Sequence, residues 1–162
     1  MGVDGEKRDL NNQSVDYKAL VRAVAQFAAI DKVRNVLAQA NKIERVFEDG
    51  QKANILSGAC VGWASSLHNH LAGLGIKTEE VKTKKTGAHK FLRCTTNQGE
   101  MMIDPTLGQF INYPKIFIGS MVALRATFLD QKNELLVGNR LWCVDHDITT
   151  REEWFEVLYT ID

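Results

Sequence analysis

Two strand-like stretches, at residues 88–96 and 100–104, constrain the fold of this chain more than any other feature. Because strand-forming residues on both sides of a short turn favour an antiparallel pair, the Asn-Gln-Gly turn at 97–99 predicts a hairpin. If two residues form the loop, Asp104 shares a sheet face with His89 and is its diagonal neighbour. A three-residue loop would turn Asp104 to the other face, unless a bulge restored it. On the two-residue register, the hairpin brings a histidine and a carboxylate together.

The rest of the chain has helical periodicity first and strand-like segments later, which is typical of an α+β fold. The expected elements are helices from Asp16 and from Asp31 to Gly50, a helix from Cys60 to Gly73, a strand at 76–84, the hairpin, a strand at 116–118, a helix at Met121–Leu129, a second hairpin at 134–144 and a last helix opened by a capping box at 150–153. We expect the N-terminal helices and a central helix with Cys60 at its tip to pack on a mostly antiparallel sheet. The polar residues 1–15 predict a flexible leader, and residues 16–162 predict a single domain.

Charge and composition exclude several classes of partner. Twenty basic and twenty acidic residues cancel in this chain of 162, so no global charge favours nucleic acid or an anionic membrane. No apolar stretch is long enough to span a bilayer, and no secretory signal opens the chain. We therefore expect a cytoplasmic protein, or one that reaches the cytosol of a target cell without a cleavable signal.

The histidines and carboxylates outside the hairpin do not predict a metal site. His68 and His70 are two residues apart in a helix and point in different directions, so they are poorly placed to bind one metal ion. The Asp-His-Asp run at 145–147 is interpreted as a solvated turn. We expect neither a metal nor another cofactor.

Cys60 is the residue whose sequence position points most clearly to a reactive side chain. Ser57 can act as a helix N-cap, which places Cys60 in the first turn, where unpaired backbone N–H groups favour an anion. A cysteine in that position can be held as the nucleophilic thiolate. The competing interpretation is a small buried hydrophobe, as we expect for Cys94 and Cys143. Three cysteines without motif spacing argue against a disulfide framework.

His89 and Asp104 supply the groups that a reactive cysteine needs. Asp104 can orient the imidazole and stabilise its charged form, and His89 can take the thiol proton if the helix tip faces the sheet. In these roles Cys60, His89 and Asp104 would carry out acyl transfer, in which the thiolate attacks an amide carbonyl and the imidazolium protonates the departing amine. The alternative is that His89 and Asp104 are ordinary surface residues of two strands.

Four features occur in order between residues 55 and 111: Gly58 and Cys60 opening a helix, Leu-Gly-Ile at 74–76, His89 on a strand, and Asp-Pro-Thr at 104–106 after a polar turn. Together they resemble the core of the transglutaminase-like and papain-like cysteine enzyme superfamily. The resemblance implies a papain/transglutaminase-like fold with Cys60 as nucleophile, His89 as general base and acid, and Asp104 as the residue that orients the histidine. Lys90 follows the histidine where eukaryotic-type transglutaminases usually have an aromatic residue, so their substrates are not implied.

The segment 104–110, Asp-Pro-Thr-Leu-Gly-Gln-Phe, is also similar to that of bacterial papain-fold toxins and effector deamidases. The resemblance implies a cysteine-dependent amide hydrolase or acyl transferase, nearest to an effector- or toxin-type protein-glutamine deamidase. The alternatives are a cysteine peptidase or a transglutaminase on the same triad, and a non-catalytic protein-binding module on the same fold. The implied partner is a protein substrate, including a host or target-cell protein, and the oligomeric state stays open.

An oxyanion that develops during acyl transfer needs two hydrogen-bond donors. The backbone N–H of Cys60 is one candidate. Papain-like enzymes add a side-chain amide from just upstream of the nucleophile, which implies Asn54 or, less directly, Gln51. Gln109 can instead contribute its amide from the segment after Asp104. Trp63 is a candidate wall of the cleft, with a core position as its competing interpretation.

Overall fold

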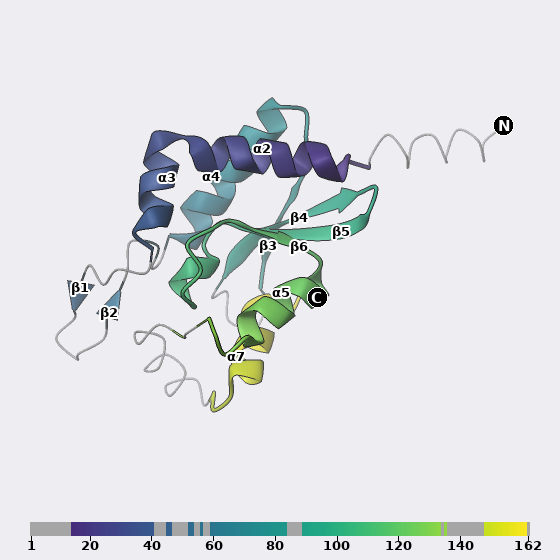
Figure 1. Ribbon diagram of the computed structural model, residues 1–162. Coiled ribbons are helices and arrows are strands. Elements are labelled where there is room, and N and C mark those ends of the chain that lie inside the picture. Colours follow the sequence, from purple (N-terminus) through teal and green to yellow (C-terminus); the bar gives the residue numbers. More distant parts are fainter. Residues whose placement is uncertain are drawn as a thin grey trace.

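The structure is a computed structural model, and it describes residues 14–40, 45–46, 52–53, 56, 59–83, 89–133, 135 and 148–161. These residues form an α+β protein with five α-helices and a four-stranded antiparallel sheet (Figure 1). The predicted α+β class is confirmed.

The sheet is a meander in which strands that follow one another in sequence are neighbours. Its strands are, in order, β3 (Glu79–Lys82), β4 (Lys90–Thr96), β5 (Gly99–Asp104) and β6 (Phe117–Gly119). Thr96 pairs with Gly99, so the β4–β5 loop has two residues, as the favourable register requires. Gly99 has a φ of 107°, a conformation that glycine adopts without steric cost. A separate antiparallel pair joins β1 (Arg45–Val46) to β2 (Lys52–Ala53).

Helices cover both faces of the sheet (Figure 1). On one face lie α2 (Tyr17–Ala29), α3 (Asp31–Ala38) and α4 (Cys60–Gly73). On the other face lie the short 3-10 helix η1 (Leu107–Gln109), α5 (Met121–Leu129) and α7 (Arg151–Tyr159). The described residues therefore form two hydrophobic cores, one on each side of the sheet.

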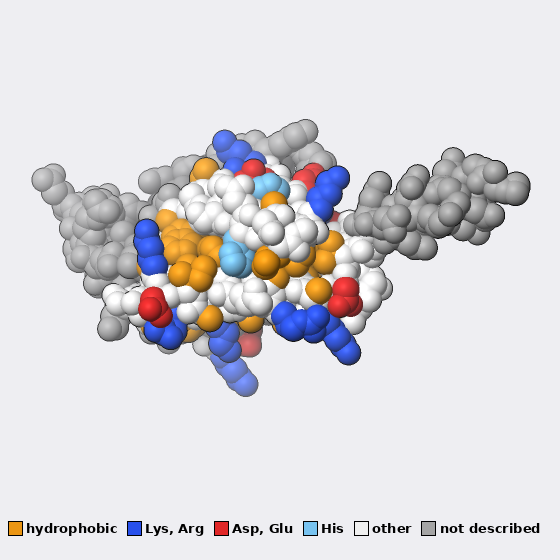
Figure 2. All heavy atoms as spheres, turned by 90° about the horizontal axis from the view of Figure 1, so that it is seen from above, with side chains coloured by type: hydrophobic (Ala, Val, Ile, Leu, Met, Phe, Trp, Pro, Cys, Tyr) orange, Lys and Arg blue, Asp and Glu red, His pale blue; other side chains and the backbone are white. Residues whose placement is uncertain are grey.

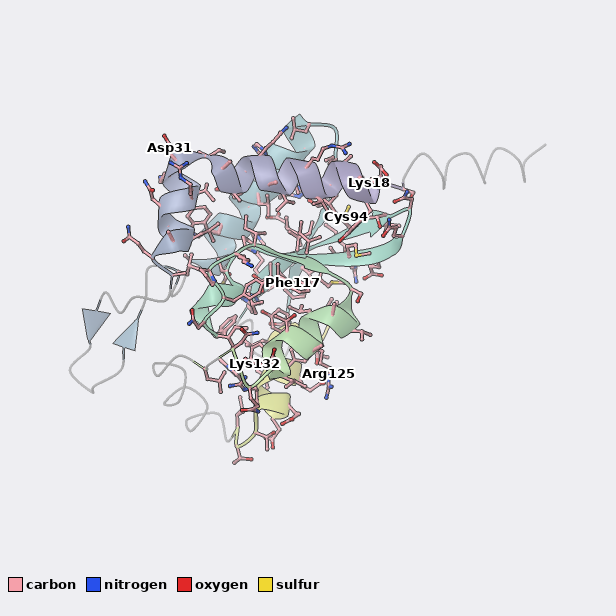
Figure 3. All side chains as sticks on the ribbon, in the orientation of Figure 1. Lys18, Asp31, Cys94, Phe117, Arg125 and Lys132 are labelled. Atoms are coloured by element: carbon pink, nitrogen blue, oxygen red, sulfur yellow. The ribbon has the colours of Figure 1, made fainter. Side chains whose placement is uncertain are left out.

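The side chains of β4 alternate between these two cores, as the period of a strand requires. Leu92 and Cys94 contact the core beneath α2 and α4, whereas Phe91 belongs to the core beneath α5 and α7. Figure 3 shows Cys94 between the β4–β5 hairpin and α2, and Phe117 on the side of α5. Cys94 is thus a core residue on the face opposite Phe91, as predicted.

Hydrogen bonds begin just before α2. The N–H of Val15 donates to the carbonyl of Thr95 (2.9 Å), and the N–H of Asn97 donates to the carbonyl of Val15 (2.8 Å). Val15 is therefore tied to β4. Residues 1–13 of the leader predicted at 1–15 lie outside the described residues, so the leader stays a prediction. Asp16, from which a helix was predicted, is the N-cap of α2, since its carboxylate accepts a hydrogen bond from the N–H of Ala19.

The second helix is shorter than predicted. α3 ends at Ala38 rather than near Gly50, and Arg45–Val46 pairs as a strand instead. The apolar spacing that suggested a longer helix does not distinguish a helical turn from a short strand over so few residues. Asp31 is the first residue of α3 and not its cap, and its carboxylate binds the guanidinium of Arg34 (2.8 Å).

α4 begins and ends where the sequence predicted. The buried stripe of α4 consists of Cys60, Ala64, Leu67 and Leu71, whereas Val61 and Leu74 are about half exposed. None of the described helices is long and apolar enough to cross a bilayer.

The C-terminal elements agree with the sequence where they are described. α5 has the predicted bounds, and Thr150 caps α7 by accepting a hydrogen bond from the N–H of Glu153 (3.1 Å). The Glu153 carboxylate returns to Thr149 rather than to Thr150. The predicted strand at 76–84 is shortened to β3. Apart from the bridging Leu135, the predicted second hairpin lies outside the described residues.

The face over α2 carries hydrophobic side chains between peripheral lysines and arginines (Figure 2). Val21 and Ile30 are 37% and 44% exposed, so α2 and the residue after it keep apolar groups in contact with solvent. Isolated exposed apolar residues of this kind are ordinary on a protein surface.

Truncation of the central helix tests this packing. Leu67→Ala should lower the free energy of unfolding by about 2–5 kcal/mol, because it removes buried methyl groups and leaves a cavity between α4 and the sheet. Urea denaturation followed by circular dichroism measures the change. Val122→Ala on α5 is the control, since Val122 is 81% exposed and should change the value by no more than about 0.5 kcal/mol. Equal effects of the two substitutions would contradict the packing of α4.

Candidate active site

Cys60 is the first residue of α4, and Ala59 is the N-cap. Ala59 makes no side-chain capping hydrogen bond, and Ser57, the predicted cap, lies outside the described residues. The first helical hydrogen bond runs from the N–H of Trp63 to the carbonyl of Ala59 (3.0 Å). The partial positive charge of a helix N-terminus therefore acts at Cys60, in the first turn as predicted.

His89 directly precedes β4, and Asp104 is the last residue of β5. Leu92 pairs with Ile103, and continuing this register puts Asp104 opposite Phe91, diagonal to His89. The His89 Nε2 atom and the Asp104 Oδ2 atom are 2.7 Å apart, and both side chains are fully buried. The hairpin thus brings the histidine and the carboxylate into direct contact.

The side chain of Cys60 completes the arrangement, because its thiol interacts with the imidazole of His89 and with the backbone N–H of Lys90. Burial raises the pKa of the Cys60 thiol, but the hydrogen bond with His89, the charge of His89 and the Lys90 N–H together bring it below its ordinary value of 9.0. Since Asp104 occupies Nε2, proton exchange with Cys60 would go through Nδ1, a ring nitrogen that the side-chain amide of Gln109 also contacts.

The histidine and the carboxylate stabilise each other's charged forms. Burial lowers the pKa of His89, but the charge and hydrogen bond of Asp104, helped by Cys60, raise it from 6.5 to about 9. Burial likewise raises the pKa of Asp104, but His89, Tyr159 and the Thr106 N–H bring it below its ordinary value. The lowered pKa of Cys60 and the raised pKa of His89 both favour a thiolate beside an imidazolium, with the carboxylate behind it.

Cys94 has the opposite environment. Burial alone raises the pKa of its thiol to about 11, and its sulfur donates a hydrogen bond to the carbonyl of Lys77 (3.5 Å). Cys94 therefore stays protonated near neutral pH, and a protonated thiol is a poor nucleophile.

Three aromatic rings enclose the imidazole of His89. Phe110 and Tyr159 meet it edge-on, with centroids 4.8 Å and 5.2 Å away, and Phe91 stacks on it at 5.8 Å. These rings fix the plane of the imidazole and remove water from around it. A low local dielectric strengthens its interaction with Asp104.

The remaining predicted site residues are divided by the structure. Gln109 is in the site, because its Nε2 atom lies 3.2 Å from Nδ1 of His89. Trp63 is half-buried against the core and packs edge-on against Phe27 of α2, at a centroid distance of 6.1 Å. This contact favours the second interpretation of Trp63, that it is a packing residue of the core rather than a wall of the cleft. Gln51 and Asn54 lie outside the described residues.

Two residues of the site were missed in the sequence. Tyr159 donates its hydroxyl hydrogen to Asp104 Oδ2 (2.6 Å), and Thr106 donates its N–H to Asp104 Oδ1 (2.9 Å). The Asp-Pro-Thr run was noted, but without a role for its threonine. Tyr159 continues the apolar stripe of Phe155 on α7, so the spacing could have shown its burial but not its hydroxyl's partner.

Metal binding has no support among the described residues, in which no group of three or more histidine, cysteine or carboxylate side chains could hold an ion. His68 is instead hydrogen-bonded through Nδ1 to the hydroxyl of Thr78 (2.7 Å). The run at 145–147 lies outside the described residues.

Comparisons with protein-family models, with curated proteins and with solved structures gave no match to this chain. The evidence for the chemistry of the site is therefore its own geometry. A thiolate at a helix tip, a proton donor beside it and a carboxylate behind the donor are together capable of nucleophilic attack followed by protonation of a leaving group.

The two described cysteines should differ sharply in reactivity. Iodoacetamide at about pH 6 should label Cys60 first, because only the thiolate reacts and the pKa is lowered for Cys60 but raised to about 11 for Cys94. The difference should be largest at low pH and narrow as pH rises. Peptide mapping by mass spectrometry gives the rate for each cysteine. Equal rates for Cys60 and Cys94 would contradict an activated thiolate.

Proposed function

We propose that this protein is a cysteine-dependent amide hydrolase or acyl transferase, with Cys60 as nucleophile, His89 as general base and acid, and Asp104 as the residue that orients His89. One observation carries the proposal. The buried imidazole of His89 is hydrogen-bonded to the Asp104 carboxylate and at the same time interacts with the Cys60 thiol, whose pKa it lowers. Such a chain of three groups activates a thiol and returns its proton to a leaving group.

The reaction proceeds in two steps. The Cys60 sulfur attacks the carbonyl carbon of an amide, and the resulting oxyanion collapses as the C–N bond breaks. The imidazolium of His89 gives its proton to the departing amine, which leaves a thioester on Cys60. Water, or a second amine, then gives a proton to His89 and attacks the thioester, which releases an acid or a new amide and restores the thiolate. The chemistry uses side chains of this chain alone.

Two groups suit the developing oxyanion. The N–H of Cys60 is in the first turn of α4, where backbone N–H groups have no partner within the helix. The side-chain amide of Gln109 contacts Nδ1 of His89, the ring nitrogen through which we propose that the proton is exchanged with Cys60, and its Nε2 atom also lies 3.3 Å from the Thr106 hydroxyl. We therefore propose Gln109, rather than an amide upstream of Cys60, as the second hydrogen-bond donor to the oxyanion.

The finer assignment rests on the resemblance of the sequence. We propose a papain/transglutaminase-like fold and a glutamine side chain of a protein as substrate, as in effector- or toxin-type deamidases. The α4 helix packed on an antiparallel sheet, with the cysteine at its tip and the histidine on the next hairpin, supports this proposal. A deamidase of this type would act in a cytosol, its own or that of a target cell.

The burial of the site favours one alternative, a protein-binding module that retains the triad without using it. His89 and Asp104 are fully buried and Cys60 is only 9% exposed. A module of this kind would have Cys60 labelled slowly and would leave amides unchanged.

Product analysis tests the proposal. Incubation with a glutamine-containing protein, such as casein, together with a primary amine should release ammonia or incorporate the amine. Mass spectrometry separates the outcomes, since deamidation adds about one dalton, proteolysis gives fragments and transamidation gives an adduct. Cys60→Ala should abolish each product.

The matched control is Cys94→Ala, which removes a buried thiol from the core beneath α2 and α4, on the face of the sheet opposite Phe91, and should leave turnover intact. Product formation that persists in Cys60→Ala would contradict the proposal. A Cys60 that reacts fast with iodoacetamide while casein stays unchanged would restrict the failure to the choice of substrate.

A further inference from the structure

Tyr159 of α7 reaches the carboxylate at the centre of the site. Its hydroxyl donates to Asp104 Oδ2 at 2.6 Å, the same oxygen that lies 2.7 Å from His89 Nε2. Tyr159 is 2% exposed, and Asp104 and His89 are fully buried, so water does not replace this bond in the folded protein. The oxygen that faces the imidazole is therefore shared between two donors.

We propose that Tyr159 is a positioning residue of the active site, whose hydroxyl fixes the Asp104 carboxylate and sets how strongly that carboxylate attracts the proton of His89. The inference rests on the proposed function, and adds a fourth member to the hydrogen-bonded chain of Cys60, His89 and Asp104. It also makes α7 part of the site, although Tyr159 lies 55 residues beyond Asp104 in sequence.

The other oxygen of the carboxylate is also held. Asp104 Oδ1 accepts hydrogen bonds from the N–H (2.9 Å) and the hydroxyl (3.4 Å) of Thr106. With Thr106 on one oxygen, and Tyr159 and His89 on the other, the carboxylate has four donors in a buried site. Its orientation is fixed without any help from solvent, as buried charged groups require.

The ring of Tyr159 is itself held in place. It stacks on Phe155, one turn earlier in α7, at a centroid distance of 5.0 Å, and meets the edge of His89 at 5.2 Å. The ring contacts therefore fix the hydroxyl in the position from which it donates to Asp104. Burial and the charge of Asp104 raise the pKa of Tyr159 well above its ordinary value, so its hydroxyl remains a neutral donor at every working pH.

Two donors on one oxygen compete for the same negative charge. The Tyr159 hydroxyl withdraws charge from the Asp104 carboxylate, so the carboxylate stabilises the His89 imidazolium less than it would alone. The titratable groups that face this pair are Cys60 from α4 and Tyr159 from α7, whereas Thr106 and Gln109 do not titrate. Removal of the hydroxyl should thus favour the imidazolium and, with it, the Cys60 thiolate.

The test is the pH profile of Cys60 alkylation in Tyr159→Phe, which removes the hydroxyl and retains the ring. The midpoint at which Cys60 becomes reactive should move to lower pH by about half a unit, which is about a threefold faster rate on the acid side of the profile. Tyr17→Phe is the matched control, since Tyr17 packs against the other core and should leave the midpoint unchanged. A packing role alone would not move the midpoint in either variant.

A second measurement is expected to shift the midpoint in the opposite direction, and it does not require Tyr159→Phe to fold. In a Tyr17→Phe, Tyr113→Phe chain labelled with fluorotyrosine, only Tyr159 carries fluorine, and its more acidic hydroxyl is a stronger donor. The midpoint should then rise. A Tyr159→Phe midpoint that is unchanged or raised, or a fluorotyrosine midpoint that is unchanged or lowered, would overturn the inference. If Cys60 of the unaltered protein shows no reactive thiolate, the proposed function fails instead.

Discussion

The hydrogen bond between His89 and Asp104 is the interaction on which the candidate site depends. Both groups are fully buried, and burial alone would disfavour the charge on each. Their 2.7 Å contact reverses that effect, because each charge stabilises the other where water is excluded. Removing either partner would take away the charge that stabilises the other, so the two charged forms persist only as a pair. The activation of Cys60 follows from the imidazolium that this pair maintains.

The fold serves to bring these groups together, and much of it could be predicted from the sequence. The two-residue loop of the β4–β5 hairpin and the bounds of α5 depend on local turn and helix signals, which a short window of sequence contains. The end of α3 at Ala38 could not be predicted in the same way. Apolar residues recur beyond it at helical spacing, and the pairing of Arg45–Val46 with another strand depends on contacts that periodicity does not encode.

The residues of the candidate site, like the elements of the fold, could be predicted only in part. Cys60, His89 and Asp104 have residue types and local positions that point to chemistry, and the structure brings them into contact. Tyr159 could be predicted only as a core residue, because a tyrosine in a buried helical stripe carries no sign of what its hydroxyl meets. Gln109 was one of several candidate amides, and its contact with Nδ1 of His89 depends on the path of the chain after β5. Contacts between distant segments are what the sequence alone leaves undetermined.

The protonation state of His89 tests the central claim most directly. Nitrogen-15 NMR of the imidazole should be recorded at a pH between the ordinary value of 6.5 and the raised value of about 9. The account predicts a charged imidazolium with both ring nitrogens protonated, and a neutral ring after Asp104→Asn, which removes the charge that stabilises it. A neutral imidazole in the unaltered protein over that range would contradict the claim that the His89–Asp104 pair holds Cys60 as a thiolate.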